Sequence, residues 1–406
     1  MASFTVMSAG DIARQILTRT FDDRYLLAAT LEDVLRRQPW QLDFGQPDFA
    51  GADGQMVLPD LLGVRSSGTT GPERVFWRHR AQIEMEVDCI LERLRLPFGE
   101  VYCFAPVNHI FGFVCGLLVA QRLRACFVFC PHGPDGAPLA RSPKRGHRLA
   151  VTLPASWHIL SRTPIALPLS VVHSAGPIPE AGRELMRRLG DALRVAEILG
   201  SAETGAVAYR DDDTAGCLPW TLMPDVTCLC PAPLLEPVAL CVASPRCAPA
   251  ARHLPEAMPE HHPGQNDASV ATDDLIEPVD DRRFHLLGRR SKFIKVNGLN
   301  VHLDTLEAEL EPTLPDGCAV VLQPVQDPVR GEGFEVFVQA AKPAWLDRAA
   351  LERQIRIAIS RRCGGTVRPI AFVYTNDVAR TITGKIKIAQ QCAHTLGRAP
   401  SVEIII

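Results

Sequence analysis

The stretch that decides the fold is Val101–Cys130, which reads VYCFAPVNHIFGFVCGLLVAQRLRACFVFC. A short apolar run comes first, a segment of helical length and period follows, and a second apolar run rich in Phe and Val ends it. The same order returns in RLAVTL, in LSVVHSAG with PEAGRELMRRLG, and in LRVAEILGSAETG. Strands that alternate with helices predict an α/β protein with a parallel sheet. In such sheets ligands bind in the loops outside the carboxyl ends of the strands.

The segments on either side of this region differ from it. Ahead of it, the pattern predicts helices over Ala9–Arg19 and Tyr25–Arg37. Behind it, from about Asp211 to Asp267, short apolar pieces are broken by Pro and Gly. The segment FHLLGRRSKFIKVNGLNV then opens a new pattern, with strands expected at CAVVLQPV, FEVFVQA and IAFVYT and a helix over Asp347–Arg361.

These patterns predict an α/β fold with two domains. The large N-terminal domain, with mixed and parallel sheets and flanking helices, is expected over residues 1–288. A hinge follows at 289–292, and a small mobile α+β domain covers residues 293–406.

Composition restricts the function. The 406 residues carry a net charge of −3, so no global basic field points to nucleic acid or to an anionic membrane. Thirteen cysteines occur without CxxC pairs, which is typical of a reducing cytoplasm. The first residues lack the apolar run of a signal peptide, and no segment reaches the roughly 18 apolar residues of a membrane span. We expect a cytoplasmic protein with neither nucleic acid nor membrane as a partner.

A polar loop stands out within the segment SSGTTGPER. Small hydroxylic residues and glycines bury no apolar surface, but they let backbone N–H groups and hydroxyls converge on an anion, usually phosphate. A flexible surface loop has the same composition, so both interpretations stand. An ordinary P-loop is excluded, because the sequence contains no GxxxxGK[ST].

Several segments between Val64 and Lys387, taken in their order, resemble the motifs of the adenylate-forming superfamily of acyl-CoA synthetases, aryl-acid ligases and adenylation domains. They are SSGTTGPER, FAPVNHIFGF, VVHSAGPIP, EILGSAETG, ATDDLIEP, FHLLGRRSKFIKVNGLNV and ARTITGKIKI. The resemblance implies that the polar loop holds the pyrophosphate of ATP, with Arg74 in place of the usual lysine. The residues so implied are Ser66, Ser67, Gly68, Thr69, Thr70, Gly71 and Arg74.

The second and third segments resemble the part of the family that contacts the substrate acid. His109 would face the carboxylate, although an isolated histidine often has a structural role. The implied acid pocket comprises His109, Phe111, Gly112, Phe113, Ser174, Gly176 and Gly205.

EILGSAETG resembles the family's Tyr-Gly-x-Thr-Glu. Glu203 would bind the Mg²⁺ that bridges the ATP phosphates, a task suited to a carboxylate, and a capping carboxylate is the alternative. Two residues depart from the pattern, since Leu199 replaces an aromatic residue and Ala202 replaces a threonine. The other implied ATP contacts in this segment are Gly200, Ser201 and Thr204.

Near the predicted hinge, Asp274 would accept both ribose hydroxyls and Arg289 would hold the ribose or a phosphate. Asp273 departs from the glycine that usually precedes the ribose-binding aspartate. The family's hinge residue falls at Ser291, which can absorb a change of φ and ψ. Lys295 and Gly298 would belong to a loop that swings toward the thiol acceptor.

Near the C-terminal end, ARTITGKIKI resembles the family's lysine motif. Lys385 would meet the carboxylate and the α-phosphate as they bond, because a mobile ammonium lowers the repulsion of two anions. A solvated lysine is the alternative.

The resemblance implies an ATP-dependent ligase that needs Mg²⁺, forms an acyl-adenylate and passes the acyl group to a thiol of coenzyme A or of carrier-protein phosphopantetheine. A compact or aromatic acid is expected, because two phenylalanines and a histidine crowd the pocket. Relatives are expected to have roughly a hundred more residues before the polar loop, so the first subdomain would be reduced. Two alternatives stay open: an enzyme that loads only a carrier protein, and a non-catalytic nucleotide-binding relative.

Overall fold

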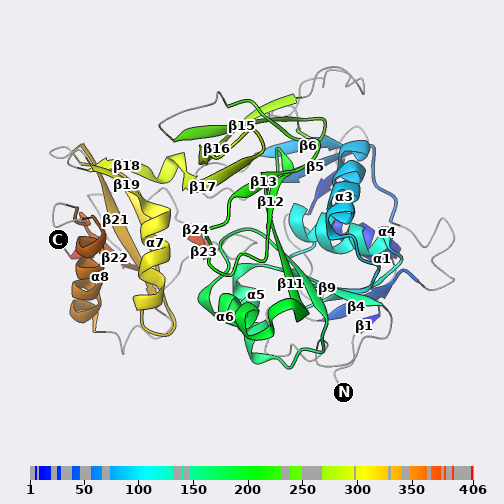
Figure 1. The fold of residues 1–406 in the computed structure, drawn as a ribbon, viewed down its shortest axis with the longest axis horizontal. Coiled ribbons are helices and arrows are strands. Elements are labelled where there is room, and N and C mark those ends of the chain that lie inside the picture. The colour runs from blue at the N-terminus through cyan, green and yellow to red at the C-terminus, as the bar shows by residue number, and fades with distance from the viewer. Residues whose placement is uncertain are drawn as a thin grey trace.

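Two bodies of β-structure lie side by side in the computed structural model of the chain (Figure 1). The structure describes residues 5–6, 9–19, 25–28, 39–45, 56–65, 74–130, 139, 146–230, 237–248, 268–296, 299–327, 331–340, 347–363, 367–375, 379–380, 386–387 and 404–405. In that part of the chain, no helix is long and apolar enough to cross a membrane.

The larger body contains a 13-stranded sheet. Five neighbouring strands, in the order β8-β7-β9-β10-β11, run parallel, and the strands from β12 to β14 continue the sheet antiparallel. In sheet order the strands are β1 (Thr5–Val6), β4 (Trp40–Asp43), β8 (Cys126–Phe129), β7 (Phe98–Cys103), β9 (His147–Thr152), β10 (Leu169–His173), β11 (Leu193–Ser201), β12 (Gly205–Asp211), β13 (Trp220–Leu222), β17 (Arg283–Arg289), β16 (Ala268–Pro278), β15 (Val238–Ser244) and β14 (Thr227–Cys228).

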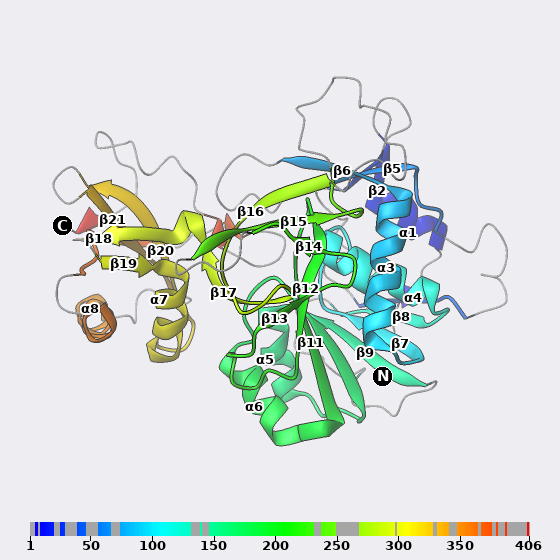
Figure 2. The ribbon, with the colours of Figure 1, turned by 45° about the horizontal axis from the view of Figure 1, so that its top comes forward.

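Helices cover both faces of the parallel strands (Figures 1 and 2). On one face α5 and α6 pack against the sheet, with Trp157 and Leu185 in a shared apolar core. On the other face a π-helix packs against Val151 and Ile198. The helices of this body are α1 (Ala9–Ile16), α3 (Arg80–Leu94), the π-helix Gly112–Leu118, α4 (Val119–Arg122), α5 (Pro154–Arg162), α6 (Glu180–Leu189) and the 3₁₀ helix Gly190–Ala192.

This arrangement confirms the predicted fold class and the predicted strand–helix order from Val101 to Thr204. The segment expected as an ordinary helix after His109 is instead largely a π-helix. Its Gly112 and Gly116 have no room for a side chain, because an added Cβ would meet the backbone of Pro106 and the thiol of Cys103. The helix therefore lies closer to β7 than residues with a Cβ would allow.

The helix predicted over Tyr25–Arg37 is wrong at its start. Tyr25–Leu27 forms strand β3, and residues 29–38 lie outside the described residues. The other predicted helix ends early, since Leu17–Arg19 forms strand β2. Both strands join a four-stranded sheet, whose pairing overrides the local preference. Its order is β2 (Leu17–Arg19), β3 (Tyr25–Leu27), β5 (Leu61–Arg65) and β6 (Val75–His79).

The smaller body has its own core beneath a six-stranded sheet. The strands and helix predicted for the C-terminal region are confirmed there. The chain enters this body through the 3₁₀ turn Arg290–Lys292, which lies in the segment predicted as a hinge. Its elements are β18 (Phe293–Val296), β19 (Leu299–His302), α7 (Leu303–Leu310), the 3₁₀ helix Glu311–Thr313, β20 (Cys318–Asp327), β21 (Gly331–Ala340), α8 (Arg348–Cys363), β22 (Phe372–Thr375) and β25 (Ile404–Ile405), with the hairpin β23 (Ala379–Arg380) and β24 (Ile386–Lys387).

Candidate active site

Three loops that carry predicted site residues leave the same edge of the parallel sheet. The strands β7, β10 and β11 end at Cys103, His173 and Ser201. Neighbouring parallel strands have their carboxyl ends at one edge, so all three loops leave that edge. The strands β7 and β10 end level with β9, whereas β11 continues past Glu197, the partner of His173, to Ser201. Hydrogen bonds confirm that two of these strands are joined there, since the Ser174 hydroxyl donates to the Ile198 carbonyl at 2.8 Å.

His109 is half-buried at the start of the π-helix. Its Nδ1 accepts a hydrogen bond from the Phe111 N–H at 3.4 Å. An accepting Nδ1 places the ring proton on Nε2, which is then the donor of the neutral ring. The same loop is tied to the N-terminal part of the chain, because the buried Asn108 amide donates to the Ala28 carbonyl at 2.9 Å.

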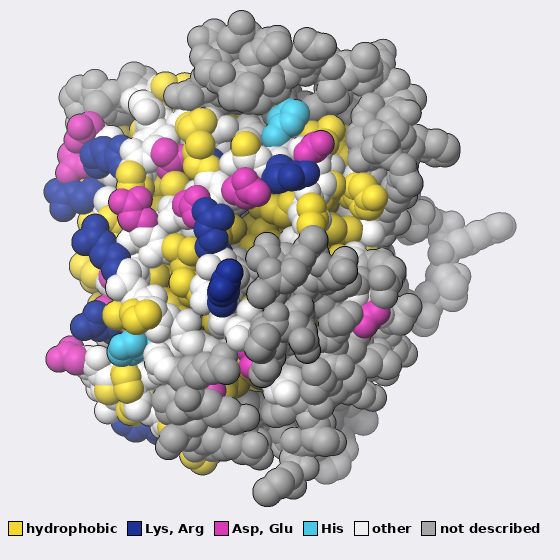
Figure 3. All heavy atoms as spheres, turned by 90° about the vertical axis from the view of Figure 1, so that its right-hand side faces the viewer, with side chains coloured by type: hydrophobic (Ala, Val, Ile, Leu, Met, Phe, Trp, Pro, Cys, Tyr) yellow, Lys and Arg dark blue, Asp and Glu magenta, His cyan; other side chains and the backbone are white. Residues whose placement is uncertain are grey.

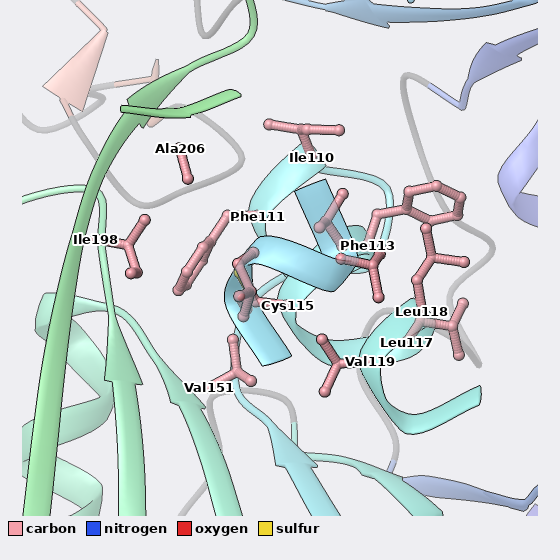
Figure 4. Packing of buried hydrophobic residues seen from close by; sticks show 14 of the residues in the cluster. Ile110, Phe111, Phe113, Cys115, Leu117, Leu118, Val119, Val151, Ile198 and Ala206 are labelled. Atoms are coloured by element: carbon pink, nitrogen blue, oxygen red, sulfur yellow. The ribbon is translucent and has the colours of Figure 1, made fainter. Parts of the chain in front are cut away.

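The two phenylalanines predicted for the acid pocket differ in position. Phe111 lies between the π-helix and Ile198 of β11 (Figure 4). Phe113 is completely buried in the core cluster. Phe111 is also buried, at 7% exposure, and belongs to the same cluster, so the lining role expected for Phe111, Gly112 and Phe113 stays a prediction.

A buried histidine fixes the loop Ser174–Gly176. The Trp157 indole N–H, which can only donate, lies 3.1 Å from Nδ1 of His173. Nε2 of His173 therefore carries the ring proton and donates to the Gly176 carbonyl at 2.9 Å. Burial lowers the pKa of His173 to about 4, although the hydrogen bonds to the backbone oppose this shift. The neutral ring holds the predicted acid-binding loop in place.

Hydrogen bonds within the turn from Ser201 to Ala206 contribute to its shape. The Thr204 hydroxyl is buried, accepts from the Ser201 N–H at 3.2 Å and donates to the Gly205 carbonyl at 2.9 Å. This hydroxyl shapes the turn, and its contact with ATP stays a prediction. Gly205 has φ +67°, and its close neighbour is the Glu86 carboxylate. Gly205 is thus part of the turn's support.

Glu203 has the chemistry that the prediction requires. Its side chain is half-buried, and its carbonyl accepts from the Ala248 N–H at 2.7 Å. Among the described residues, no three or more His, Cys, Asp or Glu side chains gather to hold a metal. One carboxylate with substrate phosphates and waters is nevertheless a common Mg²⁺ environment, so a single Glu203 fits this ion.

Asp274 and Arg289 lie directly opposite each other where β16 pairs with β17. The next pair along the chain also has opposite charges, since Arg290 Nε lies 3.7 Å from the Asp273 carboxylate. The unusual Asp273 is therefore compensated at a partly exposed site. Asp274 itself is half-buried, and its N–H donates to the Thr272 hydroxyl at 3.2 Å.

Several predicted site residues lie outside the described residues: Ser66, Ser67, Gly68, Thr69, Thr70, Gly71, Gly298 and Lys385. The ends of the polar loop are nevertheless fixed, because Arg65 of β5 pairs with Val75 of β6 beside the exposed Arg74. The hairpin β23–β24 flanks the segment with Lys385 and lies between the two bodies in Figures 1 and 2. Ser291 lies in the 3₁₀ turn, and Lys295 pairs with Asn300 in β18–β19.

Sequence reasoning missed a group of buried polar residues under the turn 201–206. Glu86 and Gln82 of α3 are buried, as are Arg78 of β6 and Arg246. One signal was present in the sequence, because Gln82 and Glu86 are one helical turn apart beside the apolar Ile83 and Val87. Polar residues on the buried face of a helix indicate a partner elsewhere in the chain.

Two cavities in the described part of the chain lie away from the loops with His109, Ser174 and Glu203. One cavity of about 240 Å³ lies against α3 and α4, and another of about 440 Å³ lies on α8. Neither is lined by a predicted site residue. On the face shown in Figure 3, basic and acidic side chains are interspersed with hydrophobic ones over the described surface.

Known proteins with similar sequences are acid–thiol ligases, although no family model matches the chain. A 4-coumarate–CoA ligase of Cereibacter sphaeroides is 24% identical over 331 residues, which are 79% of this chain and 68% of that relative. A 3,4-dihydroxybenzoate–[aryl-carrier protein] ligase of Bacillus anthracis is 25% identical over 254 residues, which are 60% of this chain and 54% of that relative. The chain thus spans between about half and two thirds of these relatives' lengths.

Solved structures show the same fold at lower identity. ATP-bound MatB from Rhodopseudomonas palustris superposes with a TM-score of 0.60 at 20% identity, over 83% of this chain and 67% of that one. The o-succinylbenzoate–CoA synthetase of Bacillus subtilis with AMP gives a TM-score of 0.62 at 15% identity, over 83% and 69%.

The chain shares with these neighbours a fold of a large sheet-built N-terminal domain followed by a small α+β domain. The resemblance of this chain to the adenylate-forming superfamily is confirmed by these comparisons. The relatives are acid–thiol ligases, which is the enzyme class that the motifs imply.

Proposed function

We propose that the protein is an ATP-dependent ligase that activates a carboxylic acid as an acyl-adenylate and transfers the acyl group to a thiol. One observation carries this proposal: the loops with His109, Ser174 and Glu203 leave one edge of the parallel sheet. The chain order and the spacing of the family's motifs support the same assignment.

In the first step, a carboxylate oxygen of the acid attacks the α-phosphorus of ATP. The bond from that phosphorus to the β-phosphate bridging oxygen breaks, and pyrophosphate leaves. The polar loop Ser66–Gly71 with Arg74 would stabilise the leaving phosphates, and Lys385 would lower the repulsion between the two anions. Glu203 would hold Mg²⁺, which neutralises phosphate charge when bound.

In the second step, a thiolate sulfur attacks the acyl carbon, the bond from that carbon to the AMP oxygen breaks, and the thiol proton goes to solvent. Rotation of the small domain about Ser291 would withdraw Lys385 and bring the segment with Lys295 and Gly298 to the site. The thiol belongs to coenzyme A or to a carrier-protein phosphopantetheine; the two curated relatives are named for one acceptor each.

We propose a compact or aromatic acid as the substrate. Phe111 and His109 lie two positions apart in this loop, where the Phe111 N–H donates to His109 Nδ1, and aromatic side chains would suit an aromatic acid. Both curated relatives are named for aromatic acids, which supports this choice. The twelve described cysteines are all free thiols, which supports a reducing compartment such as the cytoplasm.

The test is to incubate the protein with Mg·ATP, hydroxylamine and a panel of carboxylic acids. We expect acid-dependent pyrophosphate and hydroxamate, strongest with aromatic acids. Parallel reactions with coenzyme A and with a phosphopantetheinylated carrier protein identify the acceptor. Folded protein that stays silent with every acid would support the non-catalytic alternative, for which the departures at Leu199 and Ala202 speak.

A further inference from the structure

A cluster of buried charges lies beneath the turn that carries Glu203. We name it the α3 cluster; it consists of Arg78, Gln82, Glu86, Asp225 and Arg246. Arg78 and Arg246 are 0% exposed, and Gln82 and Glu86 are 4% and 5% exposed. Burial of such groups costs free energy unless each finds a partner, so their contacts indicate what the cluster holds.

The contacts of the cluster converge on the backbone of Ala206. Glu86 accepts a hydrogen bond from the Ala206 N–H at 3.1 Å, while its other oxygen lies 2.6 Å from Arg78 Nη1. Arg246 Nη2 donates to the Ala206 carbonyl at 2.7 Å. Both backbone polar groups of Ala206 are thus held by charged side chains that lie far away in the sequence.

The other end of the turn is held by the same helix. Gln82 Nε2 donates to the carbonyls of Pro245 and Cys247, at 3.0 and 2.9 Å. The next residue, Ala248, donates its N–H to the Glu203 carbonyl at 2.7 Å. Helix α3 is therefore connected to Glu203 by hydrogen bonds through the segment 245–248.

Space as well as hydrogen bonding fixes the turn. Gly205 has φ +67°, and a Cβ added there would lie 2.5 Å from Glu86 Oε2. Asp225 orients Arg246 through two hydrogen bonds, of 2.7 Å to Nε and 2.9 Å to Nη2. Such bidentate pairs fix direction as well as distance.

We propose that Glu86 and Arg246 are positioning residues of the proposed reaction, which fix the backbone of residues 203–206 so that the Glu203 carboxylate is preorganised for Mg·ATP. The inference rests on the proposed function. Both residues would act through the backbone of the turn and not by contact with the reacting groups. Arg78 extends the same network to β6, the strand that follows the predicted phosphate loop.

The test compares Glu86→Gln with Glu100→Gln. Glu100 is a matched control, because it is also buried and its carboxylate pairs with a buried arginine, Arg148, at 3.0 Å. It lies near the amino end of β7, at the edge of the sheet opposite the site. Two quantities are measured for each variant: the hydrogen-exchange rate of the amides in 201–206, which can be measured without enzymatic activity, and the thermal unfolding midpoint.

We expect the amides of 201–206 to exchange at least tenfold faster in Glu86→Gln and to stay unchanged in Glu100→Gln. The apparent Mg²⁺ requirement for pyrophosphate release should rise about tenfold, with the KM for the acid changed less than threefold. Excess Mg²⁺ should restore part of the rate in Glu86→Gln only. Arg246→Lys, which keeps the charge beside Asp225, should show a smaller change in the same direction and serves if Glu86→Gln does not fold.

Unchanged exchange in 201–206, or equal kinetic losses in the two glutamine variants, would overturn the inference. If no acid supports turnover by the wild-type protein, the proposed function fails. Exchange in 201–206 then decides by itself whether the cluster fixes this turn.

Discussion

At the scale of single residues, motifs in the sequence predict residues with reactive or ligand-binding side chains. They do not predict the buried residues that hold the backbone of the site in place. Glu203, Asp274 and His109 are predicted as site residues because their residue types and positions match a motif. Glu86 and Arg246 are not, since their meaning lies in contacts with Ala206, 120 and 40 positions away along the chain. Periodicity shows that a helical face is buried, and it carries no information about the partner of a polar side chain there.

Lys385 gives the sharpest prediction at this scale. Lys385→Ala should lower acyl-adenylate formation by about 10²–10³-fold, because one charge that stabilises the transition state is removed. Thioester formation from a supplied acyl-adenylate should stay within about threefold of the wild type. The control is Lys387→Ala, two residues further along, for which both half-reactions should be retained. Equal losses in both half-reactions of Lys385→Ala would show that its assigned role is wrong.

His173 predicts how stability depends on pH. Its folded pKa of about 4 lies below the ordinary value of 6.5, so the unfolded chain binds the proton more readily. Its contribution is fully present above pH 6.5 and is lost as pH falls toward 4, by up to about 1.4 kcal/mol per pH unit. Urea unfolding between pH 4 and 7 should therefore show a shallower pH slope in His173→Gln. The same slope in both proteins would contradict the assigned burial of a neutral ring.

At the scale of elements, local pattern predicted the strands and helices of the parallel sheet. It failed where distant pairing decides, as at Tyr25–Leu27, which forms a strand because it pairs with Leu17–Arg19 and with β5. It also missed the π-helix, because close approach of Gly112 and Gly116 to β7 and its following loop is a tertiary effect. The short strands after Asp211 were hidden by frequent Pro and Gly.

Substitution of glycines with positive φ by alanine can cost stability in two ways, through the backbone conformation and through contact of the added Cβ with a neighbour. Gly205 and Gly190 have φ +67° and +50°, but only Gly205 has a neighbour that an added Cβ would meet. Gly205→Ala should lose about 1–2 kcal/mol from its positive φ. Gly190 combines φ 50° with ψ −138°, which residues with a Cβ rarely adopt, so Gly190→Ala should lose about 1–3 kcal/mol from the backbone alone. Gly205→Ala should lose a further 1 kcal/mol or so through displacement of Glu86. Denaturant unfolding of Gly205→Ala in the wild type and in a Glu86→Ala background isolates this second loss, and equal losses in the two backgrounds would mean that Glu86 does not support the turn.

At the scale of the whole molecule, the chain passes from one body to the other through the turn Arg290–Lys292. The sequence indicated this place through a change of pattern and through Ser291 in the hinge position. The division of the chain into residues 1–288 and 293–406 stays a prediction, as does the rotation.

Ser291→Pro tests the rotation. Proline is tolerated in the first turn of a helix but fixes its own φ and restricts the preceding residue. If the two half-reactions need different hinge conformations, this variant should slow one of them at least tenfold more than the other. Ser291→Ala should change neither by more than about twofold. Single-turnover measurements of each half-reaction separate the cases, and equal slowing would count against a hinge at this residue.

The central claim is that an acid oxygen attacks the α-phosphorus of ATP. It is tested by supplying an acid that supports hydroxamate formation, labelled with ¹⁸O in its carboxylate, together with Mg·ATP and the accepted thiol. Mass spectrometry of the products should find one ¹⁸O atom in AMP and none in pyrophosphate. Label in inorganic phosphate with release of ADP would contradict the account.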